Sequence, residues 1–141
     1  MLLQEFRPAY AALFARASPA EALYYQASRG KFEVLVQLME PLLPGPQARV
    51  LELGTSQFSP LLKSLRPQWQ VVSWDLGEGS RALAEAGGVE CHWGDALVGV
   101  PDSLKASQFD LILCSEVMEH LQGNPHKMLR HLSSLLVPGG H

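Results

Sequence analysis

Residues 49–59 read Arg-Val-Leu-Glu-Leu-Gly-Thr-Ser-Gln-Phe-Ser, and this stretch decides the fold. It predicts an apolar strand, a turn through Gly54 and the start of a helix. A second apolar segment, residues 70–75, ends on Asp75, which lies 21 positions after that glycine. This is the pattern of an adenosine-binding site. The glycine lets a ligand approach the main chain, and a carboxylate at the next strand tip accepts hydrogen bonds from ribose hydroxyls.

The turn lacks two of the glycines that a dinucleotide site requires. Backbone amides close on a pyrophosphate when glycine occupies the first, third and sixth positions of such a turn. Here those positions hold Gly54, Ser56 and Ser59. S-adenosylmethionine carries no phosphate, so a site for it does not need that approach. The turn therefore favours a sulfonium nucleoside over a dinucleotide.

With these residues the chain resembles the class I S-adenosylmethionine-dependent methyltransferases. Their first motif is a hydrophobic strand, an acidic residue, a hydrophobic residue and a glycine, as in residues 50–54. The family usually has further glycines where this chain has Thr55, Ser56 and Gln57. The resemblance implies S-adenosylmethionine as the cofactor and transfer of its methyl group to an acceptor that the sequence does not identify. Three later segments match the family in the expected order: residues 93–96, 109–121 and 135–140.

The resemblance implies that the first turn holds the methionine end of the cofactor. Glu52 would orient the turn or the charged methionine end, and Gly54 would be the cofactor's backbone neighbour. Thr55 and Ser56 could hydrogen-bond the amino or carboxylate group of the cofactor. In the alternative interpretation Glu52 is a strand residue paired with a nearby base, Gly54 only makes a turn, and the two hydroxyls only satisfy that turn.

The resemblance also implies that the next two strand tips hold the nucleoside. Asp75 would bind the ribose, and Leu76 would pack against the adenine face. Asp95 would receive the adenine amino group, with the backbone near Ala96 completing the base pocket. The alternatives are that Asp75 caps the following helix and that Asp95 makes a turn with its own backbone.

The segment after the predicted fourth strand has two interpretations. In the first, Ser115 and Glu116 lie beside the cofactor, and Glu119 and His120 lie near the acceptor entrance or form structural hydrogen bonds. His120 is then a candidate general base, because the ordinary pKa of histidine is close to neutrality. In the second, a helix that begins at Glu116 puts Glu116, Glu119 and His120 on one face, as in the small-RNA 2′-O-methyltransferases, where a similar run binds a divalent metal. We favour the first interpretation and predict no metal.

The alternation of elements predicts an α/β fold, a Rossmann-like doubly wound parallel sheet with strand order 3-2-1-4. Residues 1–43 are expected to form an N-terminal helical cap and residues 44–141 a partial S-adenosylmethionine-binding domain, packed as one compact unit. The cap would contain a helix over residues 2–14 with a kink or delay at Pro8, a helix starting at Ser18, and a further helix over 31–39. The second domain is expected to contain strands at 49–53, 70–75, 89–93 and 109–114, and helices at 60–65, 80–86, 116–121 and 125–136.

Composition narrows the class of protein further. The chain has 141 residues, is 47% hydrophobic and carries a formal charge of −3, which suits one domain with a real core. The charge shows no basic excess that would attract nucleic acid phosphates. No apolar run approaches the length of about 20 residues that crosses a bilayer, and Glu5 and Arg7 interrupt the N-terminus where a signal peptide would be apolar. We therefore expect a cytoplasmic protein that binds neither membrane nor nucleic acid.

The sequence stops at the turn that precedes the fifth strand of the family. The fourth strand would then be a sheet edge although its sequence is as apolar as that of a central strand. We expect a truncated domain in which a second copy or another chain covers this strand. The alternative to an enzyme is a non-catalytic or partial cofactor-binding module that associates with a partner. A nicotinamide-dependent oxidoreductase is a weaker third interpretation, which the missing glycines disfavour.

Overall fold

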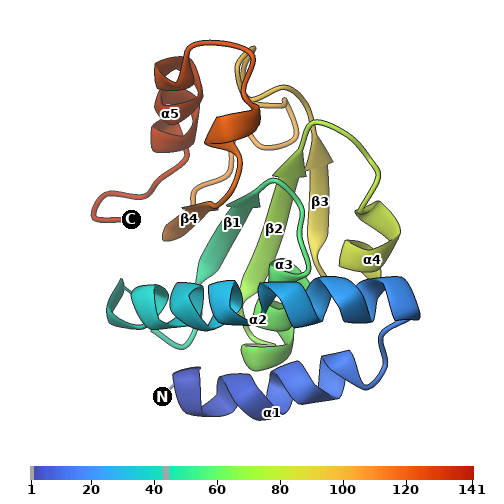
Figure 1. The fold of residues 1–141 in the computed structure, drawn as a ribbon. Coiled ribbons are helices and arrows are strands. Elements are labelled where there is room, and N and C mark those ends of the chain that lie inside the picture. The colour runs from blue at the N-terminus through green and yellow to red at the C-terminus, as the bar shows by residue number, and fades with distance from the viewer. Residues whose placement is uncertain (1, 43–44) are drawn as a thin grey trace.

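A parallel sheet in the order β3-β2-β1-β4 forms the centre of the molecule (Figure 1). The computed structural model describes residues 2–42 and 45–141. The strands are β1 (Arg49–Leu53), β2 (Gln70–Asp75), β3 (Glu90–Trp93) and β4 (Leu111–Cys114). The predicted α/β class and strand order are confirmed. Since all four strands run parallel, their carboxyl ends meet at one edge of the sheet, where ligands of such folds bind.

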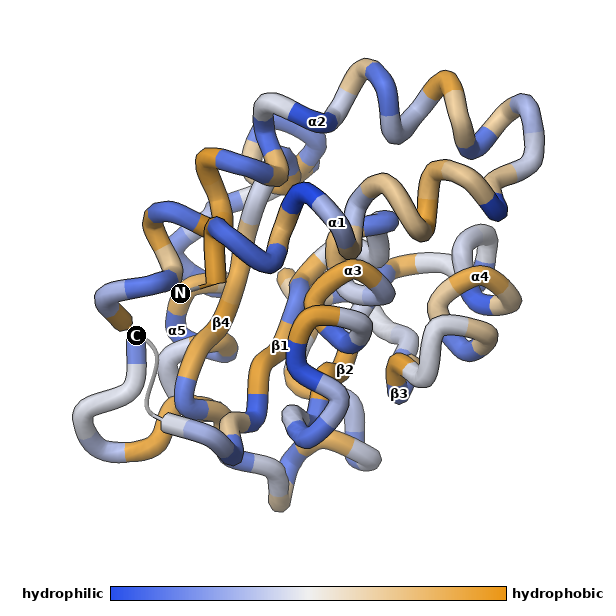
Figure 2. The backbone as a smooth tube through the Cα atoms, turned by 90° about the horizontal axis from the view of Figure 1, so that it is seen from below, coloured by the Kyte–Doolittle hydropathy of each residue, from blue (hydrophilic) through white to orange (hydrophobic). Residues whose placement is uncertain are grey.

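Two hydrophobic clusters enclose the sheet because strand side chains alternate between its faces. Val50 and Val71 pack with buried residues of α1 (Leu2–Phe14), α2 (Pro19–Met39) and α3 (Phe58–Leu65). Leu51 and Trp74 pack with Met128 of α5 (Pro125–Ser134). The remaining helices are α4 (Arg81–Ala86) and two short 3₁₀ turns, η1 (Glu40–Leu42) and η2 (Met118–His120). Figure 2 shows the apolar residues of β1, β2 and β4 between these helical layers.

The second helix of the cap is longer than predicted. The capping box of Ser18 and Glu21 forms as expected, but α2 then continues through Gly30 to Met39 instead of ending before a separate helix. The reason is one continuous buried stripe at three- and four-residue spacings: Tyr25, Ser28, Phe32, Val36 and Met39. Packing of this stripe outweighs the cost of about 1 kcal/mol that a glycine carries inside a helix. The predicted boundary between residues 43 and 44 lies outside the described residues.

Several other element boundaries differ from the predictions. Pro8 lies inside α1 and does not delay the start of that helix, and α3 begins at Phe58. Ser59 therefore lies inside α3. Residues 116–121 form no α-helix, only the 3₁₀ turn η2, which changes the geometry expected for that segment. None of the helices in residues 2–42 and 45–141 is long and apolar enough to cross a membrane.

Candidate functional site: two adjoining cavities at the strand tips

The carboxyl ends of β1, β2 and β3 are tied together by their main chains. Gly54 follows β1 with a φ of 82°, and its N–H donates to the carbonyl of Trp74 at 2.9 Å. Gly94 follows β3, and its N–H donates to the carbonyl of Asp75 at 2.9 Å. These bonds fix three successive strand tips around one hollow.

Two adjoining cavities open at this edge. The first has a volume of about 280 Å³. The second, about 180 Å³, lies toward α2 and shares Gly54, Asp75, Glu116 and Val117 with the first. The first cavity is also lined by Leu53, Trp74, Leu76, Gly94, Asp95, Ala96, His120 and Leu121. The second is also lined by Tyr24, Lys31, Phe32, Leu35, Glu52, Thr55, Ser56 and Ser115.

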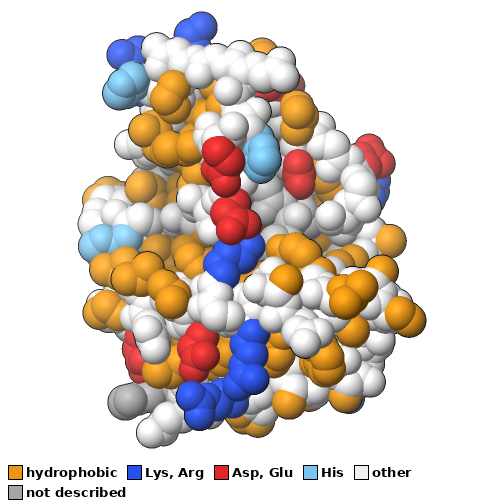
Figure 3. All heavy atoms as spheres, viewed as in Figure 1, with side chains coloured by type: hydrophobic (Ala, Val, Ile, Leu, Met, Phe, Trp, Pro, Cys, Tyr) orange, Lys and Arg blue, Asp and Glu red, His pale blue; other side chains and the backbone are white. Residues whose placement is uncertain are grey.

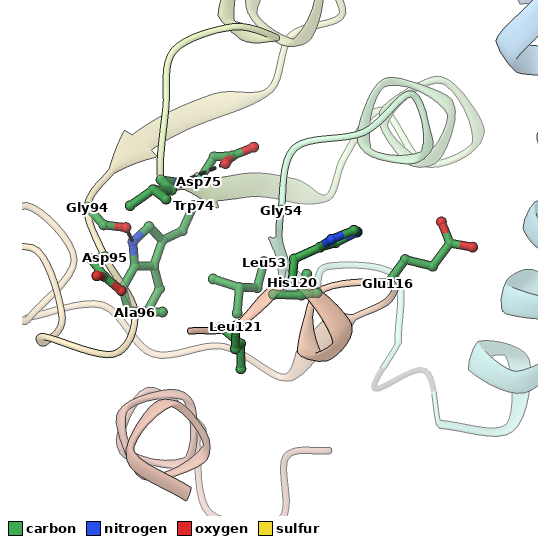
Figure 4. Close-up of a pocket in the computed structure, with 12 residues that line it drawn as sticks. Leu53, Gly54, Trp74, Asp75, Gly94, Asp95, Ala96, Glu116, His120 and Leu121 are labelled. Atoms are coloured by element: carbon green, nitrogen blue, oxygen red, sulfur yellow. Dashed lines mark hydrogen bonds between the residues drawn. The ribbon is translucent and has the colours of Figure 1, made fainter. Parts of the chain in front are cut away.

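Figure 4 shows how the first cavity is arranged. Asp95 and Ala96 lie at one end beside the indole of Trp74, whose Nε1–H donates to the carbonyl of Gly94 at 2.9 Å. Glu116 lies at the opposite end, and His120 is placed between them. One end of the cavity therefore combines the Trp74 indole with the carboxylate of Asp95, and the other end carries the carboxylate of Glu116.

Asp75 joins the turn after β1 to the tip of β2. Its Oδ2 accepts a hydrogen bond from the Thr55 N–H at 2.7 Å, and its Oδ1 accepts one from the Leu76 N–H at 2.6 Å. Ser80 occupies the N-cap position of α4, although its side chain makes no capping hydrogen bond, so Asp75 does not take the capping role that the sequence left open. The Gly77 N–H also donates to Oδ1, at 3.5 Å. Since each carboxylate oxygen can accept about two hydrogen bonds, the half-buried group retains capacity for a ligand hydroxyl at Oδ2.

Glu52 is buried beneath the turn, with 4% of the residue exposed. It accepts hydrogen bonds from the Ser56 N–H at 3.3 Å, the Ser56 hydroxyl at 2.6 Å and the Ser59 hydroxyl. Burial raises the pKa of the Glu52 carboxyl above its ordinary value, although these hydrogen bonds and the charge of Lys31 act to lower it. The described hydrogen-bond partners of Glu52 are therefore Ser56 in the turn and Ser59 in α3, and no basic side chain is among them.

Asp95 and Ala96 both line the first cavity. Asp95 is exposed, and its Oδ1 accepts a hydrogen bond from the Leu97 N–H at 2.8 Å, which is the turn interaction weighed as its alternative role. Ala96 is buried, and its carbonyl lies 2.7 Å from Nδ1 of His131. Leu76 lines the same cavity and is 74% exposed, so an incoming ring would cover it.

The segment after β4 does not have the geometry that a helical metal site requires. Glu116 has a φ of 55°, so it does not begin a helix, and Glu119 lines neither cavity. Within the described ranges no three His, Cys, Asp or Glu side chains gather as metal ligands would. The metal-binding interpretation assumed a helix that begins at Glu116, and that helix does not form. Glu116 and His120 line the first cavity, and Ser115 lines the second.

Sequence reasoning missed several residues that line the cavities. Trp74 precedes Asp75 on β2, and strand alternation alone suggests only a buried core residue there. Val117 and Leu121 belong to the segment that was expected to be helical. Lys31 reaches the second cavity from α2, and no motif near it predicted this position. Its only signal is the helical spacing to Tyr24 and Leu35, which line the same cavity.

We expect Gly54→Ala to lower the free energy of unfolding by about 1–2 kcal/mol, because an L-residue is strained at this φ. A Cβ at this position would also lie 2.9 Å from Cγ2 of Val117. Urea denaturation measures the loss. Val117→Ala is the matched background: there the contact is relieved and only the backbone strain remains, so the loss should become smaller. Equal stability of the unaltered protein, the two single variants and the double variant would contradict a strained turn.

The fold and the site together define a Rossmann-like α/β domain in which the glycine turn and the acid line a shared cavity. A family described as "Methyltransferase domain" matches residues 5–141, and the chain belongs to this family. It is a member of the class I S-adenosylmethionine-dependent methyltransferases, as the resemblance implied. Comparison with curated proteins finds no match.

Solved structures support the same fold. Coclaurine N-methyltransferase, solved with N-methylheliamine and S-adenosylhomocysteine, is 21% identical with a TM-score of 0.64 over 76% of this chain. A TehB-like S-adenosylmethionine-dependent methyltransferase from Corynebacterium glutamicum is 20% identical, with a TM-score of 0.62 over 87% of this chain. The YcgJ protein from Bacillus subtilis is 20% identical, with a TM-score of 0.61 over 79%. The matches cover 33%, 71% and 48% of those proteins, respectively.

Proposed function

We propose that this chain binds S-adenosylmethionine in the two adjoining cavities and takes part in methyl transfer to an acceptor that is still unidentified. One observation carries the proposal: the bare turn at Gly54 and the carboxylate of Asp75 line the same cavities. The residues fit such a compound. A side chain at position 54 would intrude on Val117, and Asp75 retains hydrogen-bonding capacity toward a sugar.

In this proposal the chain acts mainly by positioning. S-adenosylmethionine, when bound, supplies a methyl group on a positively charged sulfur that is already a good electrophile. Asp75 would hold the ribose hydroxyls, and Asp95, Ala96 and Leu76 would surround the adenine. Glu52 keeps the turn of Thr55 and Ser56 in place through the hydrogen bonds described above. Such alignment can supply a large part of a rate enhancement without dedicated acid–base groups.

His120 is the group best placed for proton transfer in this proposal. It is exposed and lines the first cavity together with Glu116. A neutral ring nitrogen of His120 would accept the proton that an acceptor loses as its lone pair bonds to the methyl carbon and the carbon–sulfur bond breaks. Glu119 lies outside both cavities, and we do not assign it a catalytic role.

Calorimetric titration distinguishes this function from its alternatives. We expect saturable, one-to-one binding of S-adenosylhomocysteine and no binding of nicotinamide dinucleotides, because the turn lacks the glycines that a pyrophosphate requires. Binding of a nicotinamide dinucleotide would support the oxidoreductase. Absence of all binding would support a non-catalytic association module, which is the second candidate because the sheet that residues 2–42 and 45–141 form has four strands.

The outer edge of β4 is the proposed place for association. His141 already pairs with it: its N–H donates to the carbonyl of Asp110 at 3.0 Å, and its carbonyl accepts from the Ile112 N–H at 2.8 Å. Beyond this pairing, an apolar hollow lies between α2 and β4, lined in part by Leu38 and Leu113. A second copy or a partner chain would cover it, and light scattering measures the resulting mass. Cytoplasmic residence also stays a prediction.

A further inference from the structure

An ion pair closes the second cavity from the side of α2. Nζ of Lys31 lies 2.7 Å from Oε2 of Glu116, which is 85 positions later in the chain. The lysine side chain is 26% exposed and the glutamate side chain 61% exposed. The rings of Tyr24 and Phe32 lie beside the ammonium group, at 5.7 and 5.4 Å from their centroids. In Figure 3 basic and acidic side chains meet near the middle of this face, above α2.

The acidic partner of this pair has a strained main chain. Glu116 has a φ of 55°, and it is the single residue other than glycine with a positive φ in the described parts of the chain. Such a conformation is unfavourable for an L-residue, and strain of this kind often marks a functional position. Burial acts to lower the pKa of Lys31, but the hydrogen bond to Glu116 and the nearby charges raise it overall. Lys31 therefore stays charged at neutral pH.

The charged side chains that line the second cavity differ in how many hydrogen bonds they already make within the protein. Glu52 is occupied by two serines, and Asp75 by the main-chain amides of Thr55 and Leu76. Glu116 accepts a hydrogen bond from Lys31, and most of its side chain is exposed. Among the residues that line this cavity in the described chain, Lys31 carries the single positive charge. An anionic group that enters here has one cation to meet, and a cationic group has Glu116 within reach.

The second cavity is also the continuation of the proposed nucleoside site. Asp75 and Gly54 line both cavities, so a ligand whose ribose lies at Asp75 projects its 5′ substituent past the turn toward Lys31. In the proposed cofactor that substituent ends in an amino acid, with one carboxylate and one ammonium group. A zwitterion is complementary to an ion pair. Its carboxylate can take the place of Glu116 beside Lys31, and its ammonium group can take the place of Lys31 beside Glu116.

We propose that the Lys31–Glu116 pair recognises the zwitterionic amino-acid end of the cofactor, Lys31 binding its carboxylate and Glu116 its ammonium group. This inference rests on the proposed function and adds a selective element to it. The pair distinguishes the complete sulfonium amino acid from adenosine compounds that lack the amino-acid end. It also connects α2 to ligand binding, because Lys31 is the charged residue of that helix that lines the cavity.

Paired calorimetric titrations test this inference. The ligands are S-adenosylhomocysteine and 5′-methylthioadenosine, which share the nucleoside and the sulfur but differ in the amino-acid end. We expect Lys31→Gln to weaken S-adenosylhomocysteine about tenfold while 5′-methylthioadenosine changes less than about twofold, because only the first ligand loses a charged partner. Lys105→Gln is the matched control: Lys105 pairs with Asp102 at 2.5 Å and lines neither cavity.

The other outcomes separate this inference from the function on which it rests. If Lys31→Gln weakens both ligands equally or neither, the inference is wrong while the proposed function stands. If the unaltered protein binds neither ligand, both are wrong. Lys31→Arg should retain most of the affinity, since it preserves the charge. Glu116→Gln should weaken S-adenosylhomocysteine but not its analogue without the amino group, and an equal effect on both would remove Glu116 from the assignment.

Discussion

Asp75→Ala is expected to weaken S-adenosylhomocysteine about 10- to 100-fold, which corresponds to about 1.5–3 kcal/mol. The reason is that a carboxylate is a strong acceptor for the two ribose hydroxyls and that its position at the tip of β2 is already fixed. Both oxygens are held by main-chain amides, those of Thr55 and Leu76, so little conformational freedom is lost when a sugar binds. Calorimetry at constant pH and salt measures the change in dissociation constant.

The same substitution also removes the acceptor of the Thr55 N–H, so its effect on the turn has to be separated from its effect on the sugar. The control is a pair of ligands, 5′-methylthioadenosine and its 2′,3′-dideoxy form. If Asp75 binds the ribose, Asp75→Ala weakens the first ligand and leaves the second nearly unchanged. Equal losses for both ligands would mean that Asp75 acts only through the turn. Asp75→Asn keeps an acceptor for Thr55 and should unfold close to the temperature of the unaltered protein.

The fold could be predicted because its signals are local and periodic. Four short apolar segments alternate with helical ones, and this alternation permits a parallel sheet with few alternative topologies. The strand tips then follow, since Gly54 comes directly after β1 and Asp75 is the last residue of β2. The cavity that Gly54 and Asp75 line also includes Asp95 and Ala96, which follow β3, because parallel strands bring their carboxyl ends together.

The remaining features depend on contacts that no local pattern records. A helix was expected over residues 60–65, but α3 begins at Phe58, and the Ser59 hydroxyl inside it donates to Glu52. Glu116 was expected to begin a helix, yet it has a left-handed main chain and pairs with Lys31. Two separate helices were expected where α2 is continuous, so Tyr24, Lys31 and Leu35 were not recognised as residues on one helix face. In each case tertiary packing decided between local structures of similar free energy.

Glu52→Ala is expected to destabilise the fold by about 2–3 kcal/mol, because it leaves buried donors without their acceptor. The donors are the Ser56 N–H and the hydroxyls of Ser56 and Ser59, which all converge on this carboxylate. Urea denaturation gives the free energy of unfolding. Glu119→Ala is the matched control, since Glu119 is exposed and lines neither cavity. An equally small loss for both variants would show that the hydrogen bonds of Glu52 contribute little.

Glu52→Gln is expected to change how the free energy of unfolding depends on pH. Burial holds the pKa of Glu52 above its ordinary value of 4.5 in the folded state, against the hydrogen bonds from Ser56 and Ser59. The folded protein therefore retains a proton that the unfolded chain releases, and its stability falls as the pH rises from about 4.5 through the raised pKa. Each unit by which the folded-state pKa exceeds the unfolded-state pKa lowers the free energy of unfolding by about 1.4 kcal/mol across this window. Since glutamine does not titrate, the unaltered protein should lose stability relative to Glu52→Gln across this window. A stability difference that stays constant or grows with pH would mean that the carboxyl group is not desolvated beneath the turn.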